Sequence, residues 1–308
     1  MKDPYLLHIF NPTKNVSPFD VNMAYEAEFD GVIPYSNVTL EEIHALTQDT
    51  IFSRGPTGAR RTGIFIGGRE FGLAVDMLQR AKAAMVPPFE VSVFADPSGA
   101  ITTAAALVAC IEAWISRLTG GDLAAKKVHI FGGTGPVGIC AGILAGQCGA
   151  EVTIASHRGK LVAQEVVNEY NGRYDVTMRG TGSGSVEEIS DIVADTHVII
   201  GSAKAGVRVV NRRQLERASN LMLAADVNAV PPSGVEGVEV NDMGKVLDHT
   251  PARAVSVGAL AIGNIKYKVH YRMFEMMKES QQPLYLDHVE AFSIAREIAR
   301  AKILSPRT

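Results

Sequence analysis

The sequence has few cysteines, no excess of charge of either sign and no long uninterrupted apolar run. Its three cysteines, Cys110, Cys140 and Cys148, show no CxxC spacing, so we expect neither a disulfide framework nor a metal site. The 30 basic and 33 acidic side chains leave a formal net charge of −3, which argues against a nucleic-acid partner. No stretch reaches the roughly 18 apolar residues of a membrane span, and the N-terminus lacks a signal-peptide pattern. We therefore expect no membrane partner and a cytoplasmic location.

What the sequence does contain is typical of a folded α/β protein. Hydrophobic residues make up 46% of the 308 positions, enough for a sizeable core, and the length suggests two domains. Apolar runs of strand length lie at 126–133, 151–157, 196–203 and 220–229. Segments of helical composition lie between them at 136–149, 160–170 and 186–195. This alternation predicts a Rossmann-type, doubly wound parallel sheet.

The first hundred residues predict a second, smaller α/β domain. Strand candidates lie at 6–10, 31–36, 62–68 and 89–96, with helical candidates at 41–47 and 74–84. An alanine-rich helix is expected over 102–118, and two more helices over 262–280 and 288–303. We expect a substrate domain over 1–118, with 264–308 packing back on it, and a nucleotide domain over 119–263. A cleft is expected between the two domains.

A glycine-rich loop follows the first strand of the nucleotide domain. Gly133, Gly135 and Gly138 form a GxGxxG pattern at the start of a helix. Gly133 would allow the tight turn, Gly135 would let a pyrophosphate approach the backbone, and Gly138 would let helix and strand pack closely. Thr134, Pro136 and Val137 complete the candidate phosphate loop. The alternative is a set of turn glycines without a ligand.

The next strand ends in a basic segment where an NAD-specific site usually carries an acid. Ser156, His157, Arg158 and Lys160 offer donors and positive charge, and an arginine here accommodates the 2′-phosphate of NADP. NADP is therefore the favoured cofactor and NAD the second choice; the alternative is a solvated basic turn. Later strand ends, where the nicotinamide half lies in such folds, contribute Ser202, Ala203, Asp226 and Asn228. Asn228 is either a carboxamide ligand or a turn-forming residue before Pro231.

Familiar catalytic sets for alcohol oxidation are missing. We find no Cys/His zinc constellation, no Ser-Tyr-xxx-Lys pattern and no evident His-Asp relay. Polar and glycine residues gather instead in short strings: SPFDVN at 17–22, ADPSG at 95–99, ITTAAA at 101–106, GGTGPVG at 132–138, ADVNAVPPSGV at 225–235 and GALAIGNIKYK at 258–268.

In these strings the chain resembles the NAD(P)-dependent methylenetetrahydromethanopterin dehydrogenases of bacterial one-carbon metabolism, over nearly its whole length. The resemblance implies an oxidoreductase that moves hydride from 5,10-methylene-tetrahydromethanopterin to NADP or NAD, giving the methenyl cation. In methylotrophic bacteria such enzymes serve formaldehyde oxidation. An aminal carbon between two nitrogens releases hydride directly, so the chemistry needs no metal. Alignment of the two reactants can supply roughly 7 to 11 kcal/mol.

The strings also supply candidates for the pterin site. Asp20, Asp96 and Lys266 are the candidate catalytic residues, because a carboxylate could grip the pterin edge or face the cation, and a lysine could contact the pterin. The candidate substrate-binding residues are Lys14, Ser17, Phe19, Asn22, Thr102, Thr103 and Lys268. Each has a structural alternative: Asp20 as the N-cap of a helix near Val21, Asp96 as a turn acid, the threonines as helix caps, and the lysines as a solvated face.

Two other functions stay open at this stage. The carrier could be tetrahydrofolate, because both pterins share the ring that the site must bind. A nucleotide-sensing module without turnover would use the glycine loop alone. A homo-oligomer is expected from the resemblance.

Overall fold

The computed structural model describes residues 3–305 and divides the chain into two compact units. The first runs to Thr102 and includes Tyr267–Ile294; the second holds Thr103–Lys266 and the chain from Ala295. The boundaries fall inside three helices, α5 (Ala100–Thr119), α10 (Ala259–Glu279) and α11 (His288–Ile303). The domain bounds predicted from the sequence differ, because they place residues 103–118, residues 264–266 and the chain from 295 in the substrate domain.

An ion pair helps to explain why the ends of α5 and α11 belong to the second unit. Arg296 in α11 donates from Nε and Nη2 to the two carboxylate oxygens of Glu112 in α5, at 2.8 and 2.9 Å. Glu112 is 8% exposed, so this bidentate pair shields a charge that would be costly to bury alone.

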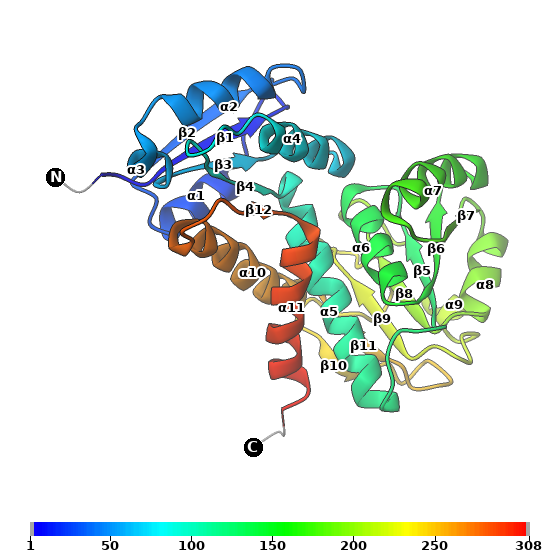
Figure 1. The fold of residues 1–308 in the computed structure, drawn as a ribbon. Helices are drawn as coiled ribbons and strands as arrows, with labels where there is room; N and C mark the ends of the chain where they lie inside the picture. The colour runs from blue at the N-terminus through cyan, green and yellow to red at the C-terminus, as the bar shows by residue number, and fades with distance from the viewer. Residues whose placement is uncertain (1–2, 306–308) are drawn as a thin grey trace. The chain divides into compact units, whose positions relative to one another are not determined.

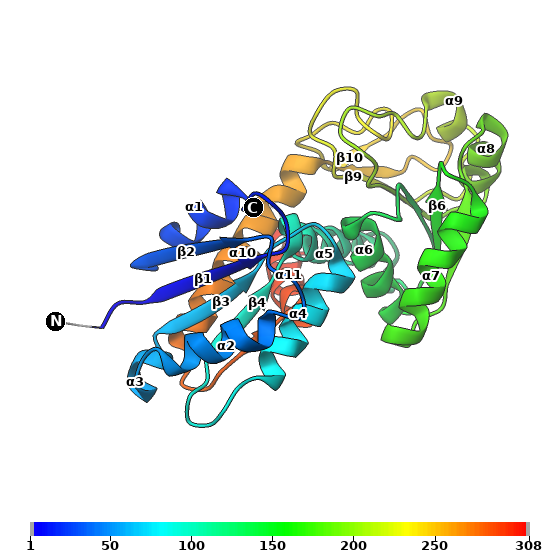
Figure 2. The same cartoon turned by 90° about the horizontal axis from the view of Figure 1, so that it is seen from above.

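The first unit is built on a five-stranded parallel sheet in the order β12-β4-β3-β1-β2. Its strands are β1 (Leu6–Asn11), β2 (Gly31–Ser36), β3 (Thr62–Ile66), β4 (Ser92–Ala95) and β12 (Tyr285–Leu286). Its helices include α1 (Pro18–Glu26), α2 (Ile43–Phe52), α3 (Pro56–Ala59) and α4 (Phe71–Ala83). Figures 1 and 2 show α2 and α4 on one face of this sheet and α1 with α10 on the other. Every residue of β3 and β4 is buried, as expected for strands covered on both faces.

The second unit has seven strands in the order β10-β11-β9-β8-β5-β6-β7, of which only β10 is antiparallel to its neighbour. Its elements are β5 (Lys127–Phe131), α6 (Pro136–Gln147), β6 (Glu151–Ser156), α7 (Lys160–Tyr174), β7 (Met178–Gly182), α8 (Val186–Ala194), β8 (Val198–Gly201), α9 (Arg212–Leu215), β9 (Leu223–Asp226), β10 (Met243–Val246) and β11 (Val255–Val257). Counted from β5, the parallel strands have the 3-2-1-4-5-6 order of dinucleotide-binding folds. The predicted α/β fold with a Rossmann-type sheet is confirmed.

The long apolar helical run that contains α5 is mostly buried. The helical run Pro97–Thr119 is long and apolar enough to cross a membrane, but 89% of its most apolar window is buried, as in the core helix of a folded protein.

Cys110 and Cys140, in α5 and α6, are buried thiols, and Cys148 is half-buried. Burial raises the pKa of Cys110 to about 12, so this thiol stays protonated at neutral pH.

Candidate active site

The glycine loop of the second unit lies between β5 and α6, and three of its glycines are required by close contacts. Gly132 has a φ of +69°, and a Cβ atom there would lie 2.4 Å from Ala203 Cα. A Cβ at Gly138 would lie 2.5 Å from Gly133 Cα, which is the expected close packing of helix on strand. The tight turn that we assigned to Gly133 is made by Gly132 instead. Gly133 is needed because a Cβ there would approach Ile130 O to 2.7 Å.

Gly135 differs from these glycines because its surroundings are open. The nearest atom to a Cβ at Gly135 would be Gly132 O, at 3.6 Å. The following residues, Pro136 and Val137, are half-buried and begin α6, with Pro136 in its first turn. The space beside Gly135, at the N-terminus of α6, is therefore open, and a helix N-terminus suits a pyrophosphate. The loop fits a dinucleotide.

The end of β6 is held by the backbone of its own turn. Ser156 is buried, and its Oγ accepts a hydrogen bond from Arg158 N at 3.2 Å. The side chains of His157, Arg158 and Lys160 are exposed. The predicted basic strand end is therefore accessible to a ligand.

The polar side chains at the ends of the later strands mostly form hydrogen bonds with the backbone of nearby loops. Ser202 Oγ donates to Phe131 O at 3.1 Å. Asp226 accepts from the backbone N–H groups of Asn228 and Val235 at 2.9 and 2.8 Å, and its burial raises its pKa. Asn228 Nδ2 donates to Pro232 O, while its Oδ1 accepts from Val230 N. The turn-forming role of Asn228, which the sequence left open, is the one that this geometry describes.

A cavity of about 300 Å³ lies against the glycine loop in the second unit. Part of its wall is apolar, from Ile189, Val207 and Val209. Its polar lining includes His157, Lys204 and Arg208. The cavity therefore joins the phosphate loop to the end of β6.

The first unit has its own switch point in the strand order, between β1 and β3, where ligands bind in open parallel sheets. Asn11 ends β1 there and is buried. Its Nδ2 donates to Thr13 O at 2.6 Å, to Thr13 Oγ1 at 2.9 Å and to Asn15 O at 3.1 Å. Asn11 thereby fixes the loop that carries Lys14 and leads to Ser17.

Two further loops meet the Asn11 loop at this edge of the sheet. A Cβ at Gly67 would lie 3.1 Å from Asn11 Oδ1, and one at Gly68 would lie 2.7 Å from Pro12 Cγ. Ser98 Oγ donates to Gly68 O at 2.7 Å. The loops after β1, β3 and β4 therefore form one connected rim.

Asp96 follows β4 and is fully buried, as are the residues that contact it. Its Oδ1 accepts from the N–H groups of Ile101 and Thr102 at 2.9 and 3.2 Å. Its Oδ2 accepts from Thr102 Oγ1 at 2.6 Å, and His270 Nδ1 lies 2.9 Å from the same oxygen. These contacts match the structural alternative of a turn acid, which here also organises the start of α5.

Phe19 and Asp20 lie in the first turn of α1. Ser17 is the N-cap residue of this helix, so the alternative of Asp20 as an N-cap is wrong. Asp20 is 2% exposed, whereas the Phe19 side chain is 38% exposed. The Phe19 ring meets His270 edge to face, with centroids 5.5 Å apart. His270 thus links Phe19 to Asp96 across the first unit.

The remaining candidates are spread over both units. Lys14, Asn22 and Lys268 are exposed in the first unit. Thr103 and Lys266 are half-buried and belong to the second unit. Within residues 3–305, no group of three or more His, Cys, Asp and Glu side chains is placed to hold a metal ion.

Sequence reasoning missed Asn11, Gly132, Lys204 and His270. Asn11 and Gly132 each follow an apolar strand, so a polar residue or extra glycine at a strand end was an available signal. His270 contacts Asp96 from 174 positions away, and no local pattern predicts such a pair.

Known sequences match this chain over most of its length. A family model described as methylene-tetrahydromethanopterin dehydrogenase, N-terminal, matches residues 18–98. The NAD(P)-dependent methylenetetrahydromethanopterin dehydrogenase of Methylorubrum extorquens is 42% identical over 96% of this chain and 98% of its own. The bifunctional protein MdtA of the same organism is 31% identical over 96% of this chain and 99% of its own.

Solved structures share the fold at low identity. An NAD-dependent malic enzyme from Thermotoga maritima has a TM-score of 0.56 at 13% identity, covering 95% of this chain and 84% of its own. A shikimate 5-dehydrogenase from Listeria monocytogenes has a TM-score of 0.50 at 13% identity, covering 97% of both chains.

Proposed function

Since the chain belongs to the family of NAD(P)-dependent methylenetetrahydromethanopterin dehydrogenases, we propose that it oxidises 5,10-methylene-tetrahydromethanopterin to the methenyl form, with NADP as the preferred acceptor and NAD as the second. The protein acts in one-carbon metabolism and formaldehyde oxidation, as a cytoplasmic homo-oligomer. The observation that carries the proposal is the turn from Gly132 to Gly138, whose contacts leave only Gly135 open.

The residues of the second unit would bind the nucleotide. At the start of α6 the backbone N–H groups of Thr134 and Val137 would bind the pyrophosphate, and His157 and Arg158 would lie at the ribose end. The bound nucleotide supplies the acceptor carbon for the hydride. The fixed glycine turn orients it without a reorganisation cost at the moment of reaction.

The residues of the first unit would bind the pterin. Phe19, exposed beside the Asn11 loop, offers a ring contact, and Lys14 and Lys268 offer positive charge to the anionic tail. The reacting carbon is an aminal, so its nitrogen lone pairs expel the hydride and no proton is removed. The chain must therefore orient the donor and stabilise charge, with neither a general base nor a metal.

The positive charge that develops on the two pterin nitrogens calls for a carboxylate nearby. Asp20, in the first turn of α1 beside Phe19, is the carboxylate that we assign to this role. Asp96 acts as a positioning residue, because its oxygens already bind α5 and His270. Lys266, the third catalytic candidate, belongs to the second unit and is therefore not among the residues of the first unit that would bind the pterin.

The test is a purified-protein assay with four combinations of substrates. Methylene-tetrahydromethanopterin or methylene-tetrahydrofolate is mixed with NADP or NAD, and reduced nucleotide is followed by absorbance. We expect the highest kcat/KM with the methanopterin substrate and NADP. A higher kcat/KM with the folate substrate would mean that the carrier is tetrahydrofolate. If no mixture gives reduced nucleotide, the chain is a nucleotide-binding protein without turnover.

A further inference from the structure

The cavity beside the glycine loop is lined by residues that suit more of a nucleotide than its phosphates. Its apolar wall, from Ile189 in α8 and from Val207 and Val209, offers an apolar contact to a purine ring. His157, which directly follows β6, lines it as well. In doubly wound folds the ribose hydroxyls lie at the end of this second strand. The adenosine end of a dinucleotide therefore fits between these walls.

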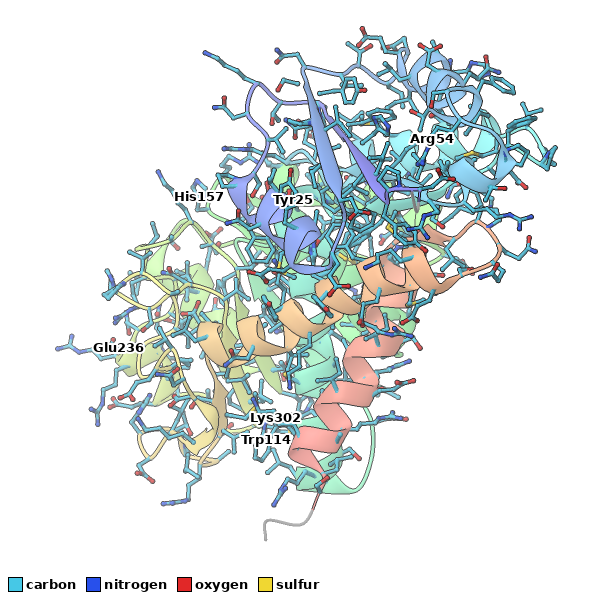
Figure 3. All side chains as sticks on the ribbon, turned by 90° about the vertical axis from the view of Figure 1, so that its left-hand side faces the viewer. Tyr25, Arg54, Trp114, His157, Glu236 and Lys302 are labelled. Carbon is cyan, nitrogen blue, oxygen red and sulfur yellow. The ribbon has the colours of Figure 1, made fainter. Side chains whose placement is uncertain are left out.

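The two cations that line the cavity from the segment after β8 differ in their contacts. Arg208 Nε donates to Ser233 O at 2.6 Å, and Arg208 Nη1 lies 2.9 Å from Glu236 Oε2. His157 and Glu236 can both be found in the second unit in Figure 3. Arg208 is therefore already neutralised and serves to hold the loop that follows β9.

Lys204 is the contrasting case. Its side chain is exposed and lines the cavity, and its ammonium makes no hydrogen bond or ion pair with any residue from 3 to 305. A cation without a partner among the described residues, beside an apolar wall, is available to an anion of the ligand. A phosphomonoester on the adenosine ribose is the anion that distinguishes NADP from NAD.

We propose that Lys204 is a specificity-determining residue that binds the 2′-phosphate of NADP from the β8 side of the cavity, opposite the end of β6. This inference rests on the proposed use of NADP. It changes the assignment made from sequence, which gave the 2′-phosphate to Arg158. Among the described residues that line the cavity, His157 is present and Arg158 is not.

The test measures binding of two adenosine fragments to the full-length protein by titration calorimetry, without any pterin. The fragments are 2′,5′-ADP, which carries the 2′-phosphate, and 5′-ADP, which lacks it. The variants are Lys204→Ala, Lys204→Glu and Arg158→Ala. Lys126→Ala is the matched control, since Lys126 lies just before β5, at the opposite end of that strand from the glycine loop. Circular dichroism establishes that each variant is folded.

We expect Lys204→Ala to weaken 2′,5′-ADP about tenfold and to leave 5′-ADP within about twofold, as for the loss of one charge-assisted contact. Lys204→Glu weakens 2′,5′-ADP further, and added salt reduces both differences. Equal loss of both fragments in Lys204→Ala, or a selective loss in Arg158→Ala alone, would overturn the inference. Because no pterin is used, these results are separate from the success or failure of the proposed reaction.

Discussion

At the scale of single residues, the side chains that shape both sites lie at the ends of strands and form hydrogen bonds with backbone groups. Asn11 and Asp226 each end a strand and bind N–H or C=O groups of the loop that follows. Asp96 follows β4 and does the same at the start of α5. Such roles depend on which atoms meet in space, so the residue types alone did not separate a ligand from a loop support.

Asn11→Asp tests the role of the Asn11 loop. The aspartate has no N–H groups for Thr13 O and Asn15 O, and its charge faces those carbonyl oxygens, so we expect a loss of about 2 kcal/mol or more in unfolding free energy. We also expect a higher KM for the pterin with an unchanged KM for NADP. Chemical denaturation and steady-state kinetics measure the two effects.

Asn15→Asp is the control for that variant, because it adds the same charge at an exposed position of the same loop. Its stability and its pterin KM should stay close to those of the parent protein. If both variants behave alike, the loop is not organised by Asn11.

His129 in β5 gives a prediction for pH. Burial lowers its pKa from 6.5 to about 4, so the unfolded chain binds more protons than the folded chain between those two values. Stability is therefore complete above pH 6.5 and falls as the pH drops toward 4, by up to about 3 kcal/mol from this residue. His197 and His8 have lowered pKa values as well and act in the same direction.

His129→Gln keeps a hydrogen-bonding side chain beside Thr196 Oγ1, 2.9 Å from His129 Nδ1, and removes the titration. We expect a smaller fall in unfolding free energy between pH 6.5 and 4 than in the parent protein. Denaturation midpoints across that range measure it, and an unchanged slope would show that His129 does not contribute.

At the scale of elements, the sequence predicted the helices and strands whose apolar pattern extends over many consecutive residues. The helix over 102–118 appears as α5, and β5, the glycine loop and α6 appear in the expected order. The strands β10, β11 and β12 were missed, because segments of only two to four residues are too short to show a period. β7, with the sequence MRGTG, was missed because two of its five residues are glycine.

Gly132→Ala tests the turn between β5 and α6. The added methyl would meet Ala203 at 2.4 Å in a left-handed backbone conformation, so we expect lower stability and a nucleotide affinity reduced at least tenfold. Gly172→Ala, in α7 with open space around it, is the control, and we expect it to raise stability by up to about 1 kcal/mol. Equal effects of the two variants would contradict the assigned role of Gly132.

At the scale of the whole molecule, the chain joins two parallel α/β units whose strand orders differ. The 3-2-1-4-5-6 order of the second unit matches dinucleotide folds, and the switch point of the first lies between β1 and β3. In the second unit the switch point lies between β5 and β8 and is bordered by the Gly132 turn. In the first unit it is bordered by the Asn11 loop and by the loops after β3 and β4. A two-substrate hydride transfer uses one site for the nucleotide and one for the one-carbon carrier.

The most direct test of this account follows the hydride itself. Methylene-tetrahydromethanopterin is prepared from dideuterated formaldehyde and incubated with the protein and NADP in ordinary water, and the reduced nucleotide is analysed by mass spectrometry. We predict one deuterium in each molecule of reduced NADP, and none when unlabelled substrate reacts in heavy water. Reduced nucleotide whose hydrogen comes from the solvent, or no reduced nucleotide at all, would contradict direct transfer from the pterin.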